Sequence, residues 1–297
     1  MSHPYQRPMS PAPGLDVFSK NIVLSKNRIA IHYYDAGRPN AGAIVLVHGL
    51  GDEADTWRHV IPELSQHHRV LAIDLPGFGR SPKPERACTI AFYCGILLNF
   101  LNDLNIEKAI FIGNSLGGMI VQQFSLIYPT RVAKLVLVDG SLVSTGRKIT
   151  LSLLIFMIPG LGEWSYNRLR KNPDAAFATL KSYYASLDGL PAADREFLYQ
   201  RVNERVWSNT QRDAFLSVLR SMVKEKIKPG EEALPASTIP TLVVWGEKDA
   251  IQPLENGKAA AARQPTTSLV VIPDAGHLPH QEKPQAFLAA VDSFLSA

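Results

Sequence analysis

The chain has 297 residues, of which 46% are hydrophobic and 20% charged, so it can bury a large core and is predicted to be globular, with one or two domains. Its net charge of +4 comes from lysines and arginines scattered among almost as many acidic residues, without a basic run interleaved with aromatics, so nucleic-acid binding is not expected. Two cysteines, Cys88 and Cys94, offer neither a disulfide framework nor a metal-ligand cluster, which favours buried thiols in a reducing compartment.

The N-terminal residues 1–18 contain four prolines before Leu15 and are expected to form a flexible, extended arm. This arm lacks the apolar stretch of a secretory signal. The longest apolar run, residues 151–158, is too short to span a bilayer and is closed by Pro159 and Gly160. We therefore expect a cytoplasmic protein without a transmembrane segment.

Short runs rich in β-branched and apolar residues recur along the chain, each followed by a turn signal, and predict buried strands of a mostly parallel sheet. Helix-like stretches at 91–104 and 119–128 alternate with them, as in βαβ units. Two earlier runs, 20–24 and 28–34, flank a Ser-Lys-Asn turn and predict an antiparallel hairpin at the sheet edge. The buried strands are predicted at residues 43–47, 69–74, 109–113, 134–139, 241–246 and 268–273. The fold class is therefore α/β, with eight strands and flanking helices.

The strand pattern stops between residues 141 and 235, where the composition becomes helical and amphipathic and is punctuated by proline and glycine. A helical block inserted between two strands of one sheet is typical of a cap. We therefore expect a core formed by residues 19–140 and 236–297, with residues 141–235 as a helical cap or lid.

The strongest local motif is Gly113-Asn114-Ser115-Leu116-Gly117, a GxSxG sequence between a predicted strand and a predicted helix. A serine on such a sharp turn has a strained backbone, and Gly113 and Gly117 let neighbouring backbone pass closely. The N-terminus of the following helix favours negative charge near Ser115. Ser115 is therefore the candidate nucleophile.

A serine hydroxyl needs a base to take its proton and a third group to orient that base. Of the eight histidines, His277 follows the last predicted strand and should reach the carboxyl edge of the sheet, where open α/β sheets bind ligands. His280 lies three residues further on, but it lacks the small Ala275-Gly276 approach. We therefore favour His277 as the base.

Two acids compete for the third role, because both should project from the carboxyl edge of the sheet. Asp249 follows the predicted strand 241–246 and precedes the segment that carries His277, in the chain order Ser, Asp, His. Asp139 ends the strand 134–139 and could instead cap the start of the lid. We favour Asp249.

The developing oxyanion also requires two donors. One candidate is the backbone N–H of Leu116, the residue after the nucleophile. The second is expected from the loop His48-Gly49-Leu50-Gly51-Asp52, with the N–H of Leu50 as the best candidate. Gly49 keeps backbone close to backbone there, and His48 is expected to shape the loop through local hydrogen bonds.

Five segments occur in order: LVHGLGDEADTW, IDLPGFGRSPKP, IGNSLGG, VVWGEKDAIQP and PDAGHLPHQEKP. With them the sequence resembles the α/β-hydrolase superfamily across nearly its whole length, and within it the capped carboxylesterases, monoacylglycerol-lipase-like proteins, enol-lactone hydrolases and C–C bond hydrolases. The resemblance implies an eight-stranded core, a Ser115, Asp249 and His277 triad, an oxyanion hole from Leu50 and Leu116, and no metal or organic cofactor.

Two departures from sister families narrow the expected activity. Haloalkane dehalogenases and epoxide hydrolases have Asp at the nucleophile position, where this chain has Ser115. C–C hydrolases often have Trp directly after the catalytic histidine, whereas Leu278 follows His277 here.

We therefore expect a serine esterase that acts on small to medium hydrophobic esters through an acyl-enzyme. Trp57 and Phe78 are candidate pocket residues that could equally belong to the core. A C–C bond or enol-lactone hydrolase is the alternative, followed by a perhydrolase or acyltransferase. A non-catalytic ligand-binding protein on the same fold ranks last.

Overall fold

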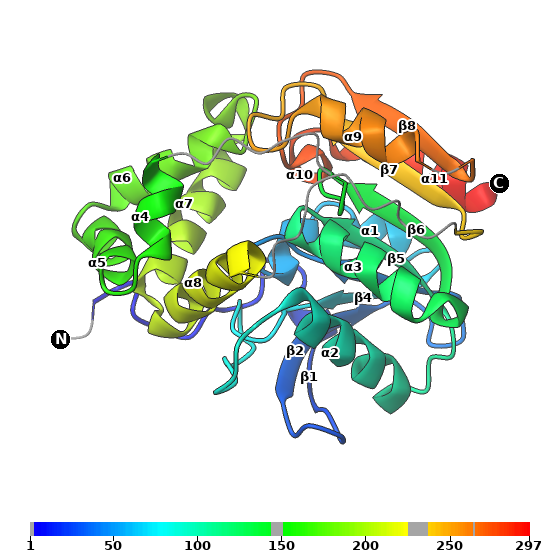
Figure 1. Cartoon of the computed structure of the whole chain (residues 1–297), viewed down its shortest axis with the longest axis horizontal. Coiled ribbons are helices and arrows are strands. Elements are labelled where there is room, and N and C mark those ends of the chain that lie inside the picture. The colour runs from blue at the N-terminus through cyan, green and yellow to red at the C-terminus, as the bar shows by residue number, and fades with distance from the viewer. Residues whose placement is uncertain (1–2, 144–150, 225–236, 264) are drawn as a thin grey trace.

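The computed structural model describes residues 3–143, 151–224, 237–263 and 265–297. Its centre is an eight-stranded sheet in the order β1-β2-β4-β3-β5-β6-β7-β8 (Figure 1). The β1–β2 and β2–β4 pairs are antiparallel and all other pairs are parallel, which confirms the predicted α/β fold and its edge hairpin. The strands are β1 (Ser19–Val23), β2 (Ala30–Ala36), β3 (Ala43–Val47), β4 (Arg69–Ile73), β5 (Ala109–Asn114), β6 (Val132–Val138), β7 (Thr241–Gly246) and β8 (Thr267–Ile272).

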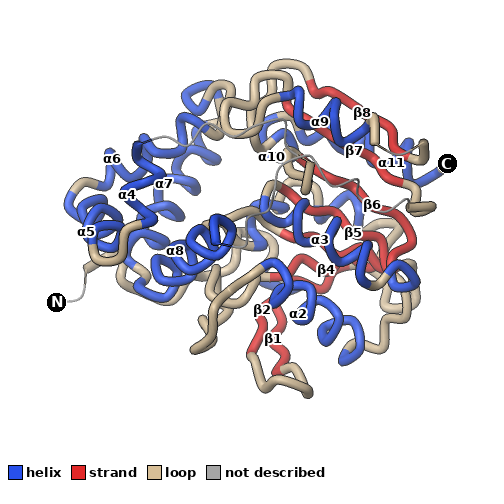
Figure 2. Tube along the Cα trace, viewed as in Figure 1, coloured by secondary structure: helices blue, strands red, loops and turns tan. Residues whose placement is uncertain are grey.

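Helices cover both faces of the sheet (Figure 2). Alternate residues of β3 point to opposite faces, with Val45 in one apolar core and Ile44 in the other. The first core holds α2 (Ile90–Asp103), α3 (Leu116–Ile127) and α9 (Leu254–Ala261), and the second holds α1 (Ile61–Leu64) and α11 (Pro284–Ser296). Because β3 is buried on both faces, its sequence is a continuous apolar run rather than an alternating one.

The predicted helices begin close to where the sequence places them. Helix α2 starts after Thr89, whose hydroxyl accepts a hydrogen bond from Phe92 N at 3.0 Å and so caps the helix. Helix α3 starts at Leu116, three residues earlier than expected, because the chain turns directly from β5 into the helix at Ser115. Both cysteines are buried free thiols, as expected.

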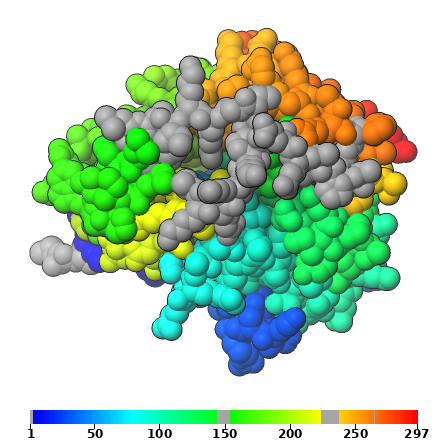
Figure 3. All heavy atoms as spheres, in the orientation of Figure 1, coloured from blue at the N-terminus to red at the C-terminus, as the bar shows by residue number. Residues whose placement is uncertain are grey.

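Between β6 and β7, the described residues 151–224 form a separate layer beside the sheet, here called the helical insertion, and these residues include five α-helices. They are α4 (Leu151–Met157), α5 (Leu161–Arg168), α6 (Pro173–Ala178), α7 (Ala192–Trp207) and α8 (Asn209–Lys224). In the space-filling view their atoms gather into one lobe (Figure 3). The insertion has its own small apolar core, in which Leu198 and Val202 of α7 pack with Leu180. Residues 144–150 and 225–235 of the predicted cap lie outside the described residues.

The N-terminal segment differs from the flexible arm expected for residues 1–18. Ala12 and Leu15 are buried in the second core, and the Ser10 carbonyl accepts a hydrogen bond from Arg201 of α7 at 2.6 Å. Arg7 pairs with Glu204 of the same helix at 3.1 Å. Prolines favour an extended chain, but they do not prevent it from packing, and this segment lies against both the sheet core and the insertion.

Candidate active site

The chain passes from β5 to α3 through Ser115, whose φ of 54° lies in the left-handed region that non-glycine residues rarely adopt. Its N–H donates to Val138 O at 2.8 Å. A Cβ at Gly117 would lie 2.7 Å from His48 O and closer still to Val47 O. A Cβ at Gly113 would lie 2.7 Å from Gly118 N. The close backbone contacts predicted for these glycines are therefore present, and they hold Ser115 at the carboxyl edge of the sheet.

Two further glycines, which no sequence motif singles out, also permit close backbone contacts, one at Ser115 and one at the loop that carries His277. A Cβ at Gly140, directly after β6, would lie 2.5 Å from Ser115 Cα, and one at Gly246, at the end of β7, would lie 2.7 Å from Ala275 O. Gly140 directly follows the predicted strand 134–139 and Gly246 ends the predicted strand 241–246, so the position of a glycine at a strand end is the signal that could have identified them.

His277 and Asp249 meet at the same edge. His277 Nδ1 donates to Asp249 Oδ2 at 2.7 Å, and Asp249 Oδ1 accepts from the backbone N–H groups of Ile251 and Gln252 at 2.8 and 2.9 Å. With Nδ1 engaged as a donor, His277 Nε2 is the ring nitrogen able to accept a proton. This Nε2 is buried and has no hydrogen-bond partner among the described residues.

Asn114 connects the strand that precedes Ser115 to the loop that carries His277. Its side-chain amide donates to His277 O at 3.1 Å and to Val138 O at 3.2 Å. The His277 N–H in turn donates to Tyr183 O of the insertion at 2.8 Å. The position of His277 therefore depends on the sheet and on the insertion together.

Asp139, the competing acid, lies beside this pair. One side-chain atom from each of Asp139, Asp249 and His277 falls within 4.8 Å of the others. Asp139 Oδ1 accepts from Gly246 N at 2.8 Å. Burial and the neighbouring Asp249 carboxylate raise the pKa of Asp139 well above its usual range, which favours the neutral form of Asp139 beside Asp249.

His280 sits apart from this cluster. It stacks on Trp57 with ring centroids 4.2 Å apart, and its Nε2 lies 2.9 Å from Thr56 Oγ1. Burial lowers the pKa of His280 to about 3, so it remains neutral.

The loop after β3 lies against Ser115. A Cβ at Gly49 would be 3.3 Å from Ser115 Cβ, and Leu50 lines the same cavity as Ser115. His48 Nε2 accepts from Leu75 N at 3.0 Å, which leaves Nδ1 as the donor to Gly49 O at 2.8 Å. His48 therefore shapes the loop through local hydrogen bonds, as the sequence predicts. Leu116 is the first residue of α3, and its N–H is one of the helix's first four, which have no acceptor within the helix.

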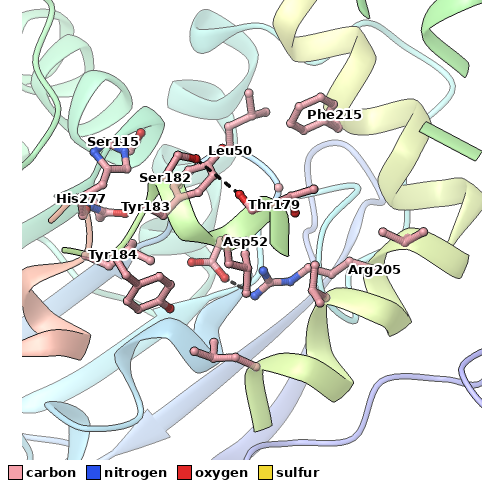
Figure 4. Close-up of a pocket in the computed structure, with 18 of the residues that line it drawn as sticks. Leu50, Asp52, Ser115, Thr179, Ser182, Tyr183, Tyr184, Arg205, Phe215 and His277 are labelled. Carbon is pink, nitrogen blue, oxygen red and sulfur yellow. Dashed lines mark hydrogen bonds and ion pairs between the residues drawn. The ribbon is translucent and has the colours of Figure 1, made fainter. Parts of the chain in front are cut away.

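A cavity of about 370 Å³ lies between the sheet edge and the insertion. Ser115 and His277 line it together with residues of α4, α5, α7 and α8. In Figure 4, Arg205 of α7 and Phe215 of α8 lie on the opposite side from Ser115 and His277. Its volume falls within the range of small-molecule sites. The insertion supplies mainly aromatic and aliphatic side chains: Phe156, Tyr166, Leu169, Leu180, Tyr183, Tyr184, Leu198, Val202, Val206 and Phe215.

Trp57 and Phe78, the two aromatic residues expected near the pocket, are not among the cavity's described lining residues. Trp57 is fully buried in the second core and Phe78 in the first. From the sequence, Trp57 is a candidate because it lies near the oxyanion loop, and both residues are aromatics near turns, but their side chains are buried in the two cores. The cavity instead takes its aromatic residues from the insertion.

A family model described as the alpha/beta hydrolase fold matches residues 42–284. The chain belongs to the α/β-hydrolase fold family. Among the hydrolase's relatives is a 2-hydroxy-6-oxononadienedioate/2-hydroxy-6-oxononatrienedioate hydrolase from Cupriavidus pinatubonensis, 30% identical over 89% of this chain and 90% of that protein.

Two solved structures are similar to this hydrolase, each 25% identical and each covering 94% of this chain and 98% of the other. One is a 2-hydroxy-6-oxo-6-phenylhexa-2,4-dienoate hydrolase from Rhodococcus, with a TM-score of 0.78. The other is a thermophilic esterase from Thermogutta terrifontis, with a TM-score of 0.75. No described helix of the hydrolase is both long and apolar enough to cross a membrane.

Proposed function

We propose that this α/β-hydrolase is a serine esterase for small to medium, uncharged hydrophobic esters. The observation that carries the proposal is the Asp249–His277 hydrogen bond, which leaves Nε2 as an acceptor in the cavity that Ser115 lines. The strained backbone of Ser115 at the head of α3 supports the same role.

In the proposed reaction, Ser115 Oγ attacks the ester carbonyl while His277 Nε2 takes its proton. The N–H groups of Leu50 and Leu116 stabilise the oxyanion of the tetrahedral intermediate. As the C–O bond breaks, His277 returns the proton to the departing alcohol and an acyl-enzyme remains. Water, deprotonated by His277, then releases the acid and regenerates Ser115. The insertion acts as the cap that lines the acyl or alcohol pocket.

The charges around the cavity favour an uncharged substrate. Arg205 is the only Arg or Lys among the described residues that line it, and it is already paired with Asp52 and Glu53. A substrate carboxylate would therefore find no unpaired guanidinium in the described part of the cavity. Tyr166, Phe156 and Phe215 offer apolar surface instead.

A C–C bond hydrolase is the second candidate, because one relative is named as a hydrolase of 2-hydroxy-6-oxononadienedioate and one similar structure as a hydrolase of 2-hydroxy-6-oxo-6-phenylhexa-2,4-dienoate. Their named substrates are a dienedioate and a dienoate, which bear carboxylates. The paired state of Arg205 argues for the ester over these anions.

The test is hydrolysis of p-nitrophenyl esters of increasing acyl length by the native protein and by Ser115→Ala. We expect kcat to fall at least about a thousandfold in the variant. Ser125→Ala is the matched control, because Ser125 lies on α3, the helix that begins after Ser115, and its hydroxyl donates to Gln122 O at 2.7 Å. Ser125 is not among the described residues that line the cavity. A native protein that cleaves a 2-hydroxy-6-oxo-dienoate faster than every ester would replace the proposal with the second candidate.

A further inference from the structure

The loop that carries Leu50 continues into two acidic residues, Asp52 and Glu53, which are buried where the loop meets α7. Glu53 is fully buried and Asp52 is 9% exposed. Asp52 N donates back to Gly49 O at 3.3 Å, which closes a tight turn around Leu50. The direction of the Leu50 N–H therefore depends on where these two acids are held.

Arg205 of α7 holds both acids from the insertion. Its Nε donates to Glu53 Oε2 at 2.6 Å and its Nη2 to Glu53 Oε1 at 2.8 Å, a bidentate pair. Nη2 also donates to Asp52 Oδ1. Figure 4 shows Arg205 reaching from its helix to Asp52, with Leu50 and Ser115 beyond. The contact joins residues 152 and 153 positions apart in the chain.

A second helix of the insertion, α8, packs close to the same turn. Gly51, between Leu50 and Asp52, has a φ of 75°, and a Cβ there would lie 3.2 Å from the Phe215 ring of α8. Leu50 and Phe215 both pack against the first core and both line the cavity. The turn around Leu50 is therefore enclosed by α7 and α8 together.

We propose that Arg205 is a positioning residue for the oxyanion hole: through Asp52 and Glu53 it fixes the direction of the Leu50 N–H. The oxyanion hole is then complete only while the insertion packs against this loop. This inference rests on the proposed esterase function. It makes the insertion a part of the catalytic apparatus as well as a wall of the pocket.

The electrostatics of the two buried acids, Asp52 and Glu53, explain why the position of the loop depends on Arg205. Burial raises the pKa of Glu53 to about 7 even though Arg205 opposes the shift. The charged groups that face Glu53 are Arg205, Asp52 and Arg201, whose Nε lies 3.7 Å from Glu53 Oε1. Without Arg205 the two buried acids lose their main counter-ion, and they must take up protons or move toward water. Either change displaces the turn.

The test compares Arg205→Gln with Asp194→Asn. Asp194 also lies on α7 and pairs the insertion with the core, at 2.7 Å from Arg58 Nη2 and 2.8 Å from His59 Nε2. It does not line the cavity among the described residues, and it lies at the other end of the helix from Arg205. The two variants therefore each remove one contact between insertion and core, and only Arg205→Gln acts on the turn around Leu50.

Three quantities are measured for each variant: kcat and KM on the best p-nitrophenyl ester, the inhibition constant of an alkyl trifluoromethyl ketone, and the melting temperature. Removing an oxyanion donor outright costs about a hundredfold to a thousandfold in kcat. For a displaced donor in Arg205→Gln we expect a fall of about tenfold to a hundredfold, with KM within about threefold. The ketone forms a hemiketal oxyanion with Ser115, so its affinity should fall with kcat/KM. Asp194→Asn should keep the native kcat and ketone affinity.

Arg205→Lys keeps the charge but loses the bidentate fork. It should fold even if Arg205→Gln does not, and its kcat should lie between those of the native protein and the Gln variant. A native kcat in both Arg205 variants would overturn the inference and leave the esterase proposal intact. A rise in KM alone would overturn it too, since Arg205 would then contact substrate. A native protein inactive on all esters would overturn both proposals.

Discussion

The two sides of the candidate site are held in place by different forces. On the sheet side, backbone packs directly on backbone: Ser115 stands between Gly113 and Gly117, and neither glycine has room for a Cβ. On the insertion side, charged side chains cross from α7 to the core, with Arg205 on Asp52 and Glu53. The first arrangement is steric and the second is electrostatic.

This difference has consequences for how each side responds to change. Backbone contacts at van der Waals distance admit no larger residue, and they depend little on pH or salt. Buried ion pairs are strong only while both partners are present and correctly ionised. We therefore expect substitutions on the sheet side to abolish folding or activity, and substitutions on the insertion side to lower activity or stability only in part.

The largest effect is expected at Gly117. A methyl group there would overlap the Val47 and His48 carbonyls, which belong to the central strand and its loop, so Gly117→Ala should yield little folded protein. Gly95→Ala is the matched control, because Gly95 lies inside α2, where an added Cβ would meet no atom of another described element within 4 Å. That change should raise the free energy of unfolding by about 0.5–1 kcal/mol.

Circular dichroism and thermal melts of the two purified variants distinguish these outcomes. A Gly117→Ala protein that melts within a few degrees of the native one would show that the elbow can relax, and the steric account of the sheet side would then be wrong.

The next effect contrasts the two acids of the site. In Asp249→Asn the amide oxygen should face the Ile251 and Gln252 N–H groups that now bind Oδ1, which turns the NH₂ group toward His277. The ring must then accept at Nδ1 and carry its proton on Nε2, the wrong tautomer for a base, and kcat should fall about a thousandfold or more.

Asp139→Asn should change kcat at pH 7 by less than about threefold. Burial and Asp249 raise the pKa of Asp139 and so favour its neutral form, and an amide can accept from Gly246 N and face Asp249 as that form does. Asparagine also tolerates the φ of 46° at this position. Steady-state kinetics of the two variants decides between the acids: a larger loss in Asp139→Asn would make Asp139 the residue that orients the base.

Much of the sheet side could be predicted from the sequence, because its determinants are local. Glycines at fixed offsets around Ser115, and apolar runs ending in Asp139 or Gly246, indicate elements whose geometry follows from a few neighbouring residues. The proximity of Asp249 and His277 agrees with the rule that parallel strands present their carboxyl ends at one edge.

The insertion side could not be predicted in the same way, because it depends on contacts between distant residues. Arg205 meets Glu53 across 152 positions, and neither residue belongs to a motif. The same limit explains two differences from expectation: Trp57 turns into the core although it follows the oxyanion loop, and the proline-rich arm is anchored by Arg201 through the Ser10 carbonyl.

After the losses expected for Gly117→Ala and Asp249→Asn, a smaller effect is a pH dependence of stability that comes from Glu53. Burial raises its pKa from 4.5 to about 7, so between these values the folded protein retains a proton that the unfolded chain releases. The free energy of unfolding contributed by Glu53 is therefore fully present below pH 4.5 and declines as the pH rises to about 7, by up to about 3 kcal/mol. Glu53→Gln is neutral throughout and lacks this decline.

Urea unfolding at pH 5 and pH 8 should show the native protein losing more stability than Glu53→Gln over that interval. Asp35→Asn is the control, because hydrogen bonds from Arg69 and Lys20 lower the pKa of the native Asp35 carboxyl despite its partial burial. This variant should lose as much stability as the native protein. Equal losses in native and Glu53→Gln would mean that Arg205 keeps Glu53 ionised in the folded state across this range, and that the insertion is held by a permanent ion pair rather than by one that titrates.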